Sequence, residues 1–173
     1  RFNIKYVGSD GKDYYPLILH TSPSGSIERI VYGILEQANK NMRRGKKPQL
    51  PLWLNPVQVR LIPVHESYIE YCAEISDKLD EFEVRNEIDD RDETLKKKIR
   101  SAEKMWIPYI CVIGKKEKKE NILSVRKREN GDQLELTLKE LVNEINNKTS
   151  FAPKQRLLLP KFISKQAIFS RIV

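Results

Sequence analysis

Residues 57–88 read VQVRLIPVHESYIEYCAEISDKLDEFEVRNEI, and this stretch decides the fold class. Its first part, residues 57–64, carries apolar side chains on both faces of an extended chain, which predicts a central β-strand. Residues 66–79 follow with apolar side chains at helical spacing, and residues 82–88 predict a second strand. A strand, a helix and a strand in this order indicate an α/β fold with helices on the faces of a sheet.

The same alternation continues toward the C-terminus. The further predicted elements are a helix over 92–105, strands over 108–113 and 122–128, a turn at 130–132, a short strand or helix entry over 134–138, and a last helix capped by Thr137. This order predicts a mixed β-sheet flanked by helices, in a domain over residues 56–147. Residues 148–173 form a tail with little helical periodicity.

A different pattern precedes residue 56. The predicted elements there are a hairpin over 1–20 whose second strand restarts at 17–19, a helix that opens at Gly25 or Ser26, and a basic linker over 43–55. We therefore predict a first unit over residues 1–42. The chain begins at Arg1 within a predicted strand, which we interpret as a fragment of a longer protein.

The composition favours a polyanionic partner. Hydrophobic residues make up 39% of the chain, enough for a core, and no apolar run approaches the roughly 20 residues that a membrane span needs. The two cysteines, Cys72 and Cys111, lie in apolar segments, so we expect reduced, buried thiols in a cytoplasmic protein. Net charge is +8, and between residues 96 and 128 twelve Lys or Arg face three Asp or Glu. Such a concentration of positive charge is typical of nucleic-acid binding.

Two predicted elements present this positive charge in an ordered way. Lys97 and Arg100 recur on one face of the helix over 92–105, and Arg126 and Arg128 alternate with apolar residues in the strand over 122–128. Arginine contacts phosphate or forks onto a guanine edge, and single-stranded RNA loops expose their bases to such readers. The four lysines between residues 115 and 119 are more typical of a solvated loop.

A second group of polar residues surrounds the first predicted helix. His20 ends a predicted strand, Gly25-Ser26 opens the helix, and Arg29 lies in its first turn. Helix N-termini favour phosphate, and an arginine fork adds bidentate contacts. The alternative is an ordinary strand-turn-helix with a surface arginine and a hydrogen-bonded histidine.

These residues carry a family resemblance. Tyr6-Val7-Gly8, Leu19-His20, Gly25-Ser26-Ile27-Glu28-Arg29 and Pro56-Val57-Gln58-Val59 resemble, in order and spacing, the threonyl-tRNA synthetases. The Gly25-Ser26-x-Glu28-Arg29 segment is similar to motif 3 of class II synthetases in its threonyl form. The resemblance implies a class IIa anticodon-binding domain, preceded by the strand-helix end of an antiparallel class II catalytic domain.

The resemblance also implies roles for single residues. His20 matches one of three protein ligands of a catalytic zinc, which in the family binds threonine. Ser26 and Arg29 match catalytic residues that line the adenylate pocket and hold ATP with its Mg²⁺. Arg100 and Glu117, with Arg126, match readers of the anticodon loop. Class II motifs 1 and 2 and the other two zinc ligands are absent, so we expect no cofactor and no catalysis in this chain alone.

The resemblance implies part of a threonine–tRNA ligase that supplies motif 3 and anticodon recognition. The implied partners are tRNAThr, threonine and ATP, with a homodimer formed through the catalytic domain and no membrane. The alternatives are a stand-alone tRNA-binding module and a class II-like accessory subunit without catalysis. For the tail over 148–173 we expect packing against the sheet, with tRNA contact as the alternative.

Overall fold

The computed structural model describes residues 2–23 and 25–167 of the chain. The chain divides into two compact units, Arg1–Ile34 and Leu35–Val173. The division falls inside a helix, so the predicted boundary after residue 42 stays a prediction. Residues 168–173 of the predicted tail lie outside the described residues.

The first unit begins with a short hairpin, as predicted. Strands β1 (Tyr6–Val7) and β2 (Asp13–Tyr14) pair antiparallel, and Gly11 closes the turn with a φ of 76° that favours glycine. The predicted strand over 17–19 is wrong: these residues are exposed and outside any strand. A strand needs a neighbour to bond its backbone, and the described residues place none beside this segment.

Helix α1 (Ile27–Arg43) follows the predicted Gly-Ser opening. Gly25 has a φ of 85°, and the Ser26 hydroxyl accepts a hydrogen bond from the backbone N–H of Arg29 at 3.4 Å. Glu28 lies in the first turn, where a negative charge is stabilised by the helix dipole. The predicted helix start is confirmed.

The second unit is built on one five-stranded sheet. Its strands are β3 (Val59–Pro63), β4 (Asn86–Ile88), β5 (Tyr109–Ile113), β6 (Leu123–Lys127) and β7 (Gln133–Leu136). Their order is β4-β3-β5-β6-β7; β4, β3 and β5 run parallel, and β6 and β7 are antiparallel to their neighbours. The predicted mixed sheet flanked by helices is confirmed.

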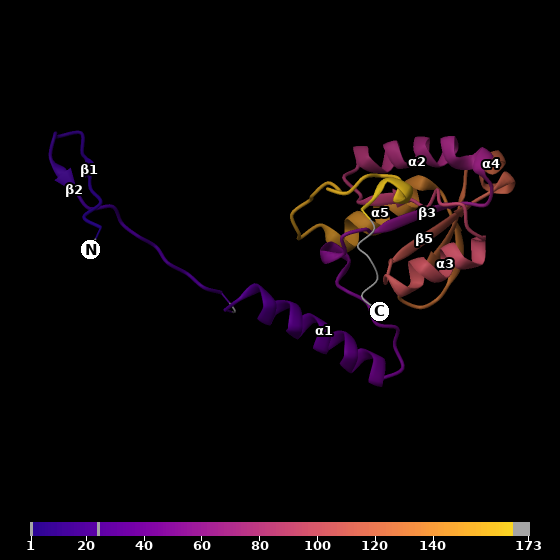
Figure 1. The fold of residues 1–173 in the computed structure, drawn as a ribbon, viewed down its shortest axis with the longest axis horizontal. Helices are drawn as coiled ribbons and strands as arrows, with labels where there is room; N and C mark the ends of the chain where they lie inside the picture. The colour runs from indigo at the N-terminus through magenta and orange to yellow at the C-terminus, as the bar shows by residue number, and fades with distance from the viewer. Residues whose placement is uncertain (1, 24, 168–173) are drawn as a thin grey trace. The chain divides into compact units, whose positions relative to one another are not determined.

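Helices cover the sheet unequally (Figure 1). The helices of this unit are α2 (Ile69–Glu81), α3 (Leu95–Lys104), α4 (Lys115–Glu120) and α5 (Leu138–Thr149), with the 3-10 turns η1 (Leu52–Leu54), η2 (Glu66–Tyr68) and η3 (Ile163–Lys165). Apolar residues of α2 and α5 pack with one face of the strands into the larger core. On the other face, Ala102 of α3 packs with Ile62 and Ile110 in a smaller core.

The predicted Thr137 cap and the predicted buried thiols are confirmed, and the structure adds a cap at His65. Thr137 caps α5 by accepting from the backbone N–H of Glu140, and His65 caps η2 by accepting from Ser67. Cys72 and Cys111 are free and buried. Burial raises the pKa of the Cys72 thiol to about 12, so this thiol is not a nucleophile at neutral pH.

Three predicted boundaries differ from the structure. Helix α2 continues to Glu81, and Glu83 turns the chain with a φ of 57°, so β4 is shorter than the predicted strand over 82–88. Helix α3 is shorter than the predicted helix over 92–105: it begins at Leu95 and ends at Lys104, and Met105 is 59% exposed. The lysine-rich segment predicted as a loop forms the short helix α4.

One ion pair is buried beneath α3. The Arg60 Nε donates to Glu87 Oε1 at 2.6 Å, and both side chains are 1% exposed. Glu87 Oε2 accepts from Gln166 Nε2 at 3.0 Å. Because the two residues face each other across the β3–β4 pair, their bond fixes the register of these strands.

The tail packs against the sheet, as predicted. Phe162 bridges Ile88 in parallel, and the Ile88 N–H donates to the carbonyl of Lys161 at 2.9 Å. Lys161 also pairs with Asp77 at the end of α2, at 2.5 Å. The tail therefore covers backbone groups of β4 that a bare edge strand would leave unpaired.

We predict that Glu87→Gln lowers the free energy of unfolding by about 3–5 kcal/mol, because it leaves the buried Arg60 charge uncompensated. Glu36→Gln is the matched control, since Glu36 pairs with Lys40 at 3.2 Å on the exposed surface of α1. The control should change stability by less than about 1 kcal/mol. Urea unfolding followed by circular dichroism measures both, and equal losses would show that burial of the pair is not what matters.

Candidate nucleic-acid interface

One part of the sheet surface is open on the side of α3. Along β6, Leu123 and Val125 are buried, while Ser124 and Arg126 on the other face are half-buried, as the predicted alternation requires. On the neighbouring β7, Gln133 and Glu135 are exposed and pair with Arg126 and Ser124. Polar side chains therefore continue from β6 to β7 on a face where the apolar contacts of α3 reach only β3 and β5.

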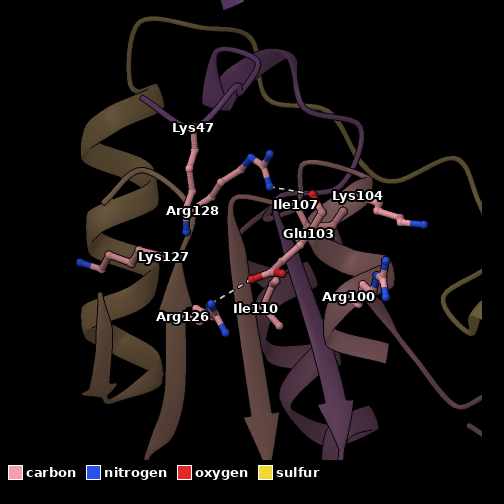
Figure 2. Close-up of a pocket in the computed structure, with 9 residues that line it drawn as sticks. All are labelled: Lys47, Arg100, Glu103, Lys104, Ile107, Ile110, Arg126, Lys127 and Arg128. Carbon is pink, nitrogen blue, oxygen red and sulfur yellow. Dashed lines mark hydrogen bonds and ion pairs between the residues drawn. The ribbon is translucent and has the colours of Figure 1, made fainter. Parts of the chain in front are cut away.

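A cavity of about 480 Å³ lies where this open surface meets the end of α3 (Figure 2). Its lining combines cationic and apolar side chains: Lys47, Arg100, Glu103, Lys104, Ile107, Ile110, Arg126, Lys127 and Arg128. Six of these nine residues are Lys or Arg and one is Glu. A partly apolar floor under a positive rim suits a flat, anionic ligand such as a nucleotide.

Glu103 organises the cationic side chains around the cavity. Its carboxylate Oε1 lies 3.0 Å from Arg126 Nη2, and Figure 2 shows the two groups facing each other from α3 and β6. Both side chains are over a third exposed, at 39% and 35%, so the Arg126 fork is accessible to a ligand. Glu103 lies near the C-terminus of α3, where the helix dipole disfavours a carboxylate. Its ion pair with Arg126 offsets this effect.

Arg128 lies at the same cavity, and two of its N–H donors are occupied by backbone carbonyls. Its Nε donates to the carbonyl of Pro48 at 2.6 Å and its Nη1 to the carbonyl of Glu103 at 2.7 Å. The guanidinium also lies 5.8 Å from the ring of Trp106. Burial lowers the pKa of Arg128 from its ordinary value, which reflects a guanidinium that has lost part of its water.

The structure brings together three of the five predicted RNA-binding residues. Arg100, Arg126 and Arg128 line one cavity. Lys97 lies a turn earlier on α3 and pairs with Glu93 at 2.9 Å, outside the cavity lining. All five assignments as RNA contacts remain predictions.

Glu117 lies at the other end of β5. Arg126 pairs with Ile110 near the start of β5. Gly114 comes directly after the last residue of β5, and Glu117 lies three residues beyond Gly114, in the first turn of α4. Four residues of strand separate the two places by about 13 Å. The Glu117 carboxylate accepts from the backbone N–H of Gly114 at 2.9 Å and so caps α4.

Lys47 and Glu103 are two of the cavity residues that the sequence did not single out. Lys47 comes from the predicted linker, where no periodicity assigned it a direction, and Glu103 stood out only as an acid between Arg100 and Lys104. The cavity is formed by segments that are about 20 to 50 residues apart in the chain. The spacing of residues in the sequence does not predict contacts between segments so far apart in the chain.

The residues predicted to hold ATP and zinc lie in the first unit. Ser26 caps α1, and the Arg29 side chain folds back over Gly25, where a Cβ would lie 2.9 Å from Arg29 Nη1. His20 is exposed. Within residues 2–23 and 25–167, no three His, Cys, Asp or Glu side chains lie close enough to hold a metal ion. In the same ranges no helix is both long and apolar enough to cross a bilayer.

Known proteins resemble this chain over most of its length. Residues 58–148, more than half of the chain, match the model of the family described as "Anticodon binding domain". A threonine–tRNA ligase from Pyrococcus horikoshii is 53% identical over 169 residues, covering 98% of this chain and 27% of that protein. The ligase of the same name from Nitrosopumilus maritimus is 46% identical, covering 96% and 27%. The chain thus spans about a quarter of the length of these curated relatives.

Solved structures agree with this match. The crystal structure of the RNA binding domain of threonyl-tRNA synthetase from Cryptosporidium parvum Iowa II has a TM-score of 0.62 at 28% identity, covering 72% of this chain and 29% of that one. Prolyl-tRNA synthetase from Cryptosporidium parvum has a TM-score of 0.52 at 24% identity, covering 61% and 24%. The second likeness concerns the fold alone.

We predict that Glu117→Ala lowers the free energy of unfolding by about 0.5–2 kcal/mol, because α4 loses its bond to the Gly114 N–H. Glu120→Ala, at the exposed end of the same helix, is the control and should change stability by less than about 0.5 kcal/mol. Urea unfolding of the two variants measures both losses in the free energy of unfolding. If the two losses are equal, the Glu117 carboxylate does not hold α4.

Proposed function

The chain belongs to the family of anticodon-binding domains, and we propose that residues 58–148 bind the anticodon loop of tRNAThr as part of a threonine–tRNA ligase. The observation that carries this proposal is the cavity between α3 and β6, where Arg100 and Arg126 lie beside an open sheet surface. The names of the relatives support it.

The chemistry of the cavity fits a splayed RNA loop. Ile107 and Ile110, each only 3% exposed, form the closed floor of the cavity, while Arg100 and Lys104 on the exposed side of α3 suit phosphate. The Arg126 fork can donate to a base edge or to phosphate, with Glu103 holding it in place. We keep Glu117 as a predicted base contact for a different part of the loop, since it lies at the far end of β5.

We propose that the first unit contributes to threonine activation in the whole ligase. Arg29, in the first turn of α1, would donate to a phosphate of ATP, which would bind with its Mg²⁺. Ser26 would line the adenylate pocket. Zinc would act by binding threonine, with His20 as one ligand. His20 alone does not make a zinc site, so the remaining ligands would come from outside these residues. A homodimer and a cytoplasmic location belong to the same proposal.

The alternatives from the sequence, a stand-alone module or an accessory subunit, are not favoured. The match to threonine–tRNA ligases covers 98% of this chain, and so includes the segment with His20, Ser26 and Arg29 as well as the anticodon-binding domain. A module that only bound tRNA would need no such segment.

We predict that Arg126→Gln weakens binding of an RNA stem-loop carrying the tRNAThr anticodon by about 1–3 kcal/mol. The control is Lys78→Gln, which removes one positive charge from an exposed position on α2, on the other side of the sheet. Fluorescence anisotropy at several salt concentrations measures the affinities. The control should bind within twofold of the unmodified chain.

Two results would count against the proposal. If the unmodified chain binds the stem-loop no better than an unrelated hairpin, the domain does not recognise this anticodon. If Lys78→Gln weakens binding as much as Arg126→Gln, net charge alone holds the RNA and the cavity is not the site.

A further inference from the structure

One wall of the cavity comes from the segment that joins α1 to the sheet. Lys47 lines the cavity together with Arg126 and Arg128 of the sheet. Its side chain lies along the β6–β7 turn, since a Cβ on Gly131 would be 3.2 Å from Lys47 Nζ. The cavity proposed above to receive RNA thus includes a residue of the linker.

Arg128 holds this linker residue in place. The Pro48 carbonyl, directly after Lys47, accepts from Arg128 Nε at 2.6 Å, and the same guanidinium donates to the Glu103 carbonyl at 2.7 Å. Arg128 therefore joins the linker to the end of α3. A planar fork reaches two carbonyls in different directions, which a lysine ammonium on a flexible stem does not reproduce.

The rest of the linker is anchored elsewhere. Asn55 donates to the carbonyls of Leu50 and Pro51, and Arg85 donates to those of Trp53 and Asn55. These bonds hold residues 50–55 and would remain without Arg128. Among the described residues, the side chain that bonds the backbone next to Lys47 is that of Arg128.

We propose that Arg128 is a positioning residue and that Lys47 is the RNA contact it serves. Arg128, partly desolvated and bonded to two carbonyls, is a poor phosphate donor, whereas the Lys47 ammonium reaches the cavity and suits a phosphate of the bound loop. This inference rests on the proposed function. By linkage, RNA in the cavity stabilises the docked linker as much as docking favours RNA.

A double-mutant cycle tests the proposal. Affinities for the anticodon stem-loop are measured for the unmodified chain, Lys47→Ala, Arg128→Lys and the double variant. Lys47→Ala should weaken binding about two- to fivefold in the unmodified chain, as an exposed ion pair does, and flatten the salt dependence by about 0.7 in the log–log slope. In the Arg128→Lys chain, the same change should have less than a 1.5-fold effect.

Arg126→Lys provides the matched background. This substitution weakens RNA binding directly but leaves the Pro48 anchor intact, so Lys47→Ala should still cost two- to fivefold there. If Arg128 served only stability, Arg128→Lys would lower the urea midpoint and the effects of Lys47→Ala and Arg128→Lys on affinity would multiply. Such multiplication, with RNA bound normally by the unmodified chain, overturns this inference and leaves the proposed function standing.

Hydrogen exchange gives a second measurement that needs no variant. Stem-loop binding should slow amide exchange over residues 46–50 of the unmodified chain, because bound RNA stabilises the docked linker. Unchanged exchange at saturating RNA would overturn the inference even if Arg128→Lys failed to fold. If the unmodified chain binds no RNA at all, the proposed function fails and this inference fails with it.

Discussion

The buried ion pair between Arg60 and Glu87 is the interaction on which the α3 side of the sheet depends. The strand registers place Glu87, Arg60, Ile110, Arg126 and Gln133 in one row across all five strands. At one end of the row the charges are buried beneath α3; at the other they meet solvent. Arg60 Nη2 also lies 3.1 Å from the sulfur of Met105, just after α3. The end of α3 is thereby held over the sheet at the point where Glu103 reaches Arg126.

The same row contains a buried polar group that lowers the stability of the fold. Within the described residues, Arg60 Nη1 is a buried side-chain nitrogen without a hydrogen-bond partner, and such a group destabilises a fold. Buried ion pairs contribute little net stability over an apolar pair, but a broken one is strongly destabilising, so wrong registers are disfavoured. A slip by one residue would move Arg126 to the face that packs against α2 and α5, where the larger core lies. The ion pair thus fixes the β3–β4 register, while the β5–β6 and β6–β7 pairings keep Arg126 on the α3 side.

The sequence was sufficient for the sheet and for part of the site. The alternation of apolar and polar residues in β6 correctly placed Arg126 away from the larger core, and helical spacing placed Arg100 on the exposed side of α3. Both arginines line the same cavity. The alternation did not determine the surroundings of Arg128, because β6 ends at Lys127 and the next residue bonds the linker instead. The lysines around Glu117 suggested a solvated loop. They gave no sign that Glu117 would accept from the Gly114 N–H and cap a short helix. Contacts such as Lys47 with the β6–β7 turn depend on tertiary packing alone.

We propose that the α3 side of the β5–β6–β7 surface receives the bases held at the cavity, and that α2 and α5 do not contact the anticodon loop. Backbone amide shifts of the ¹⁵N-labelled chain, followed by NMR while the tRNAThr stem-loop is added, test it most directly. We expect the largest changes at Arg100, Ser124 and Arg126, with little change along α2. Changes concentrated on α2 and α5, with β6 and the end of α3 unaffected, would contradict it.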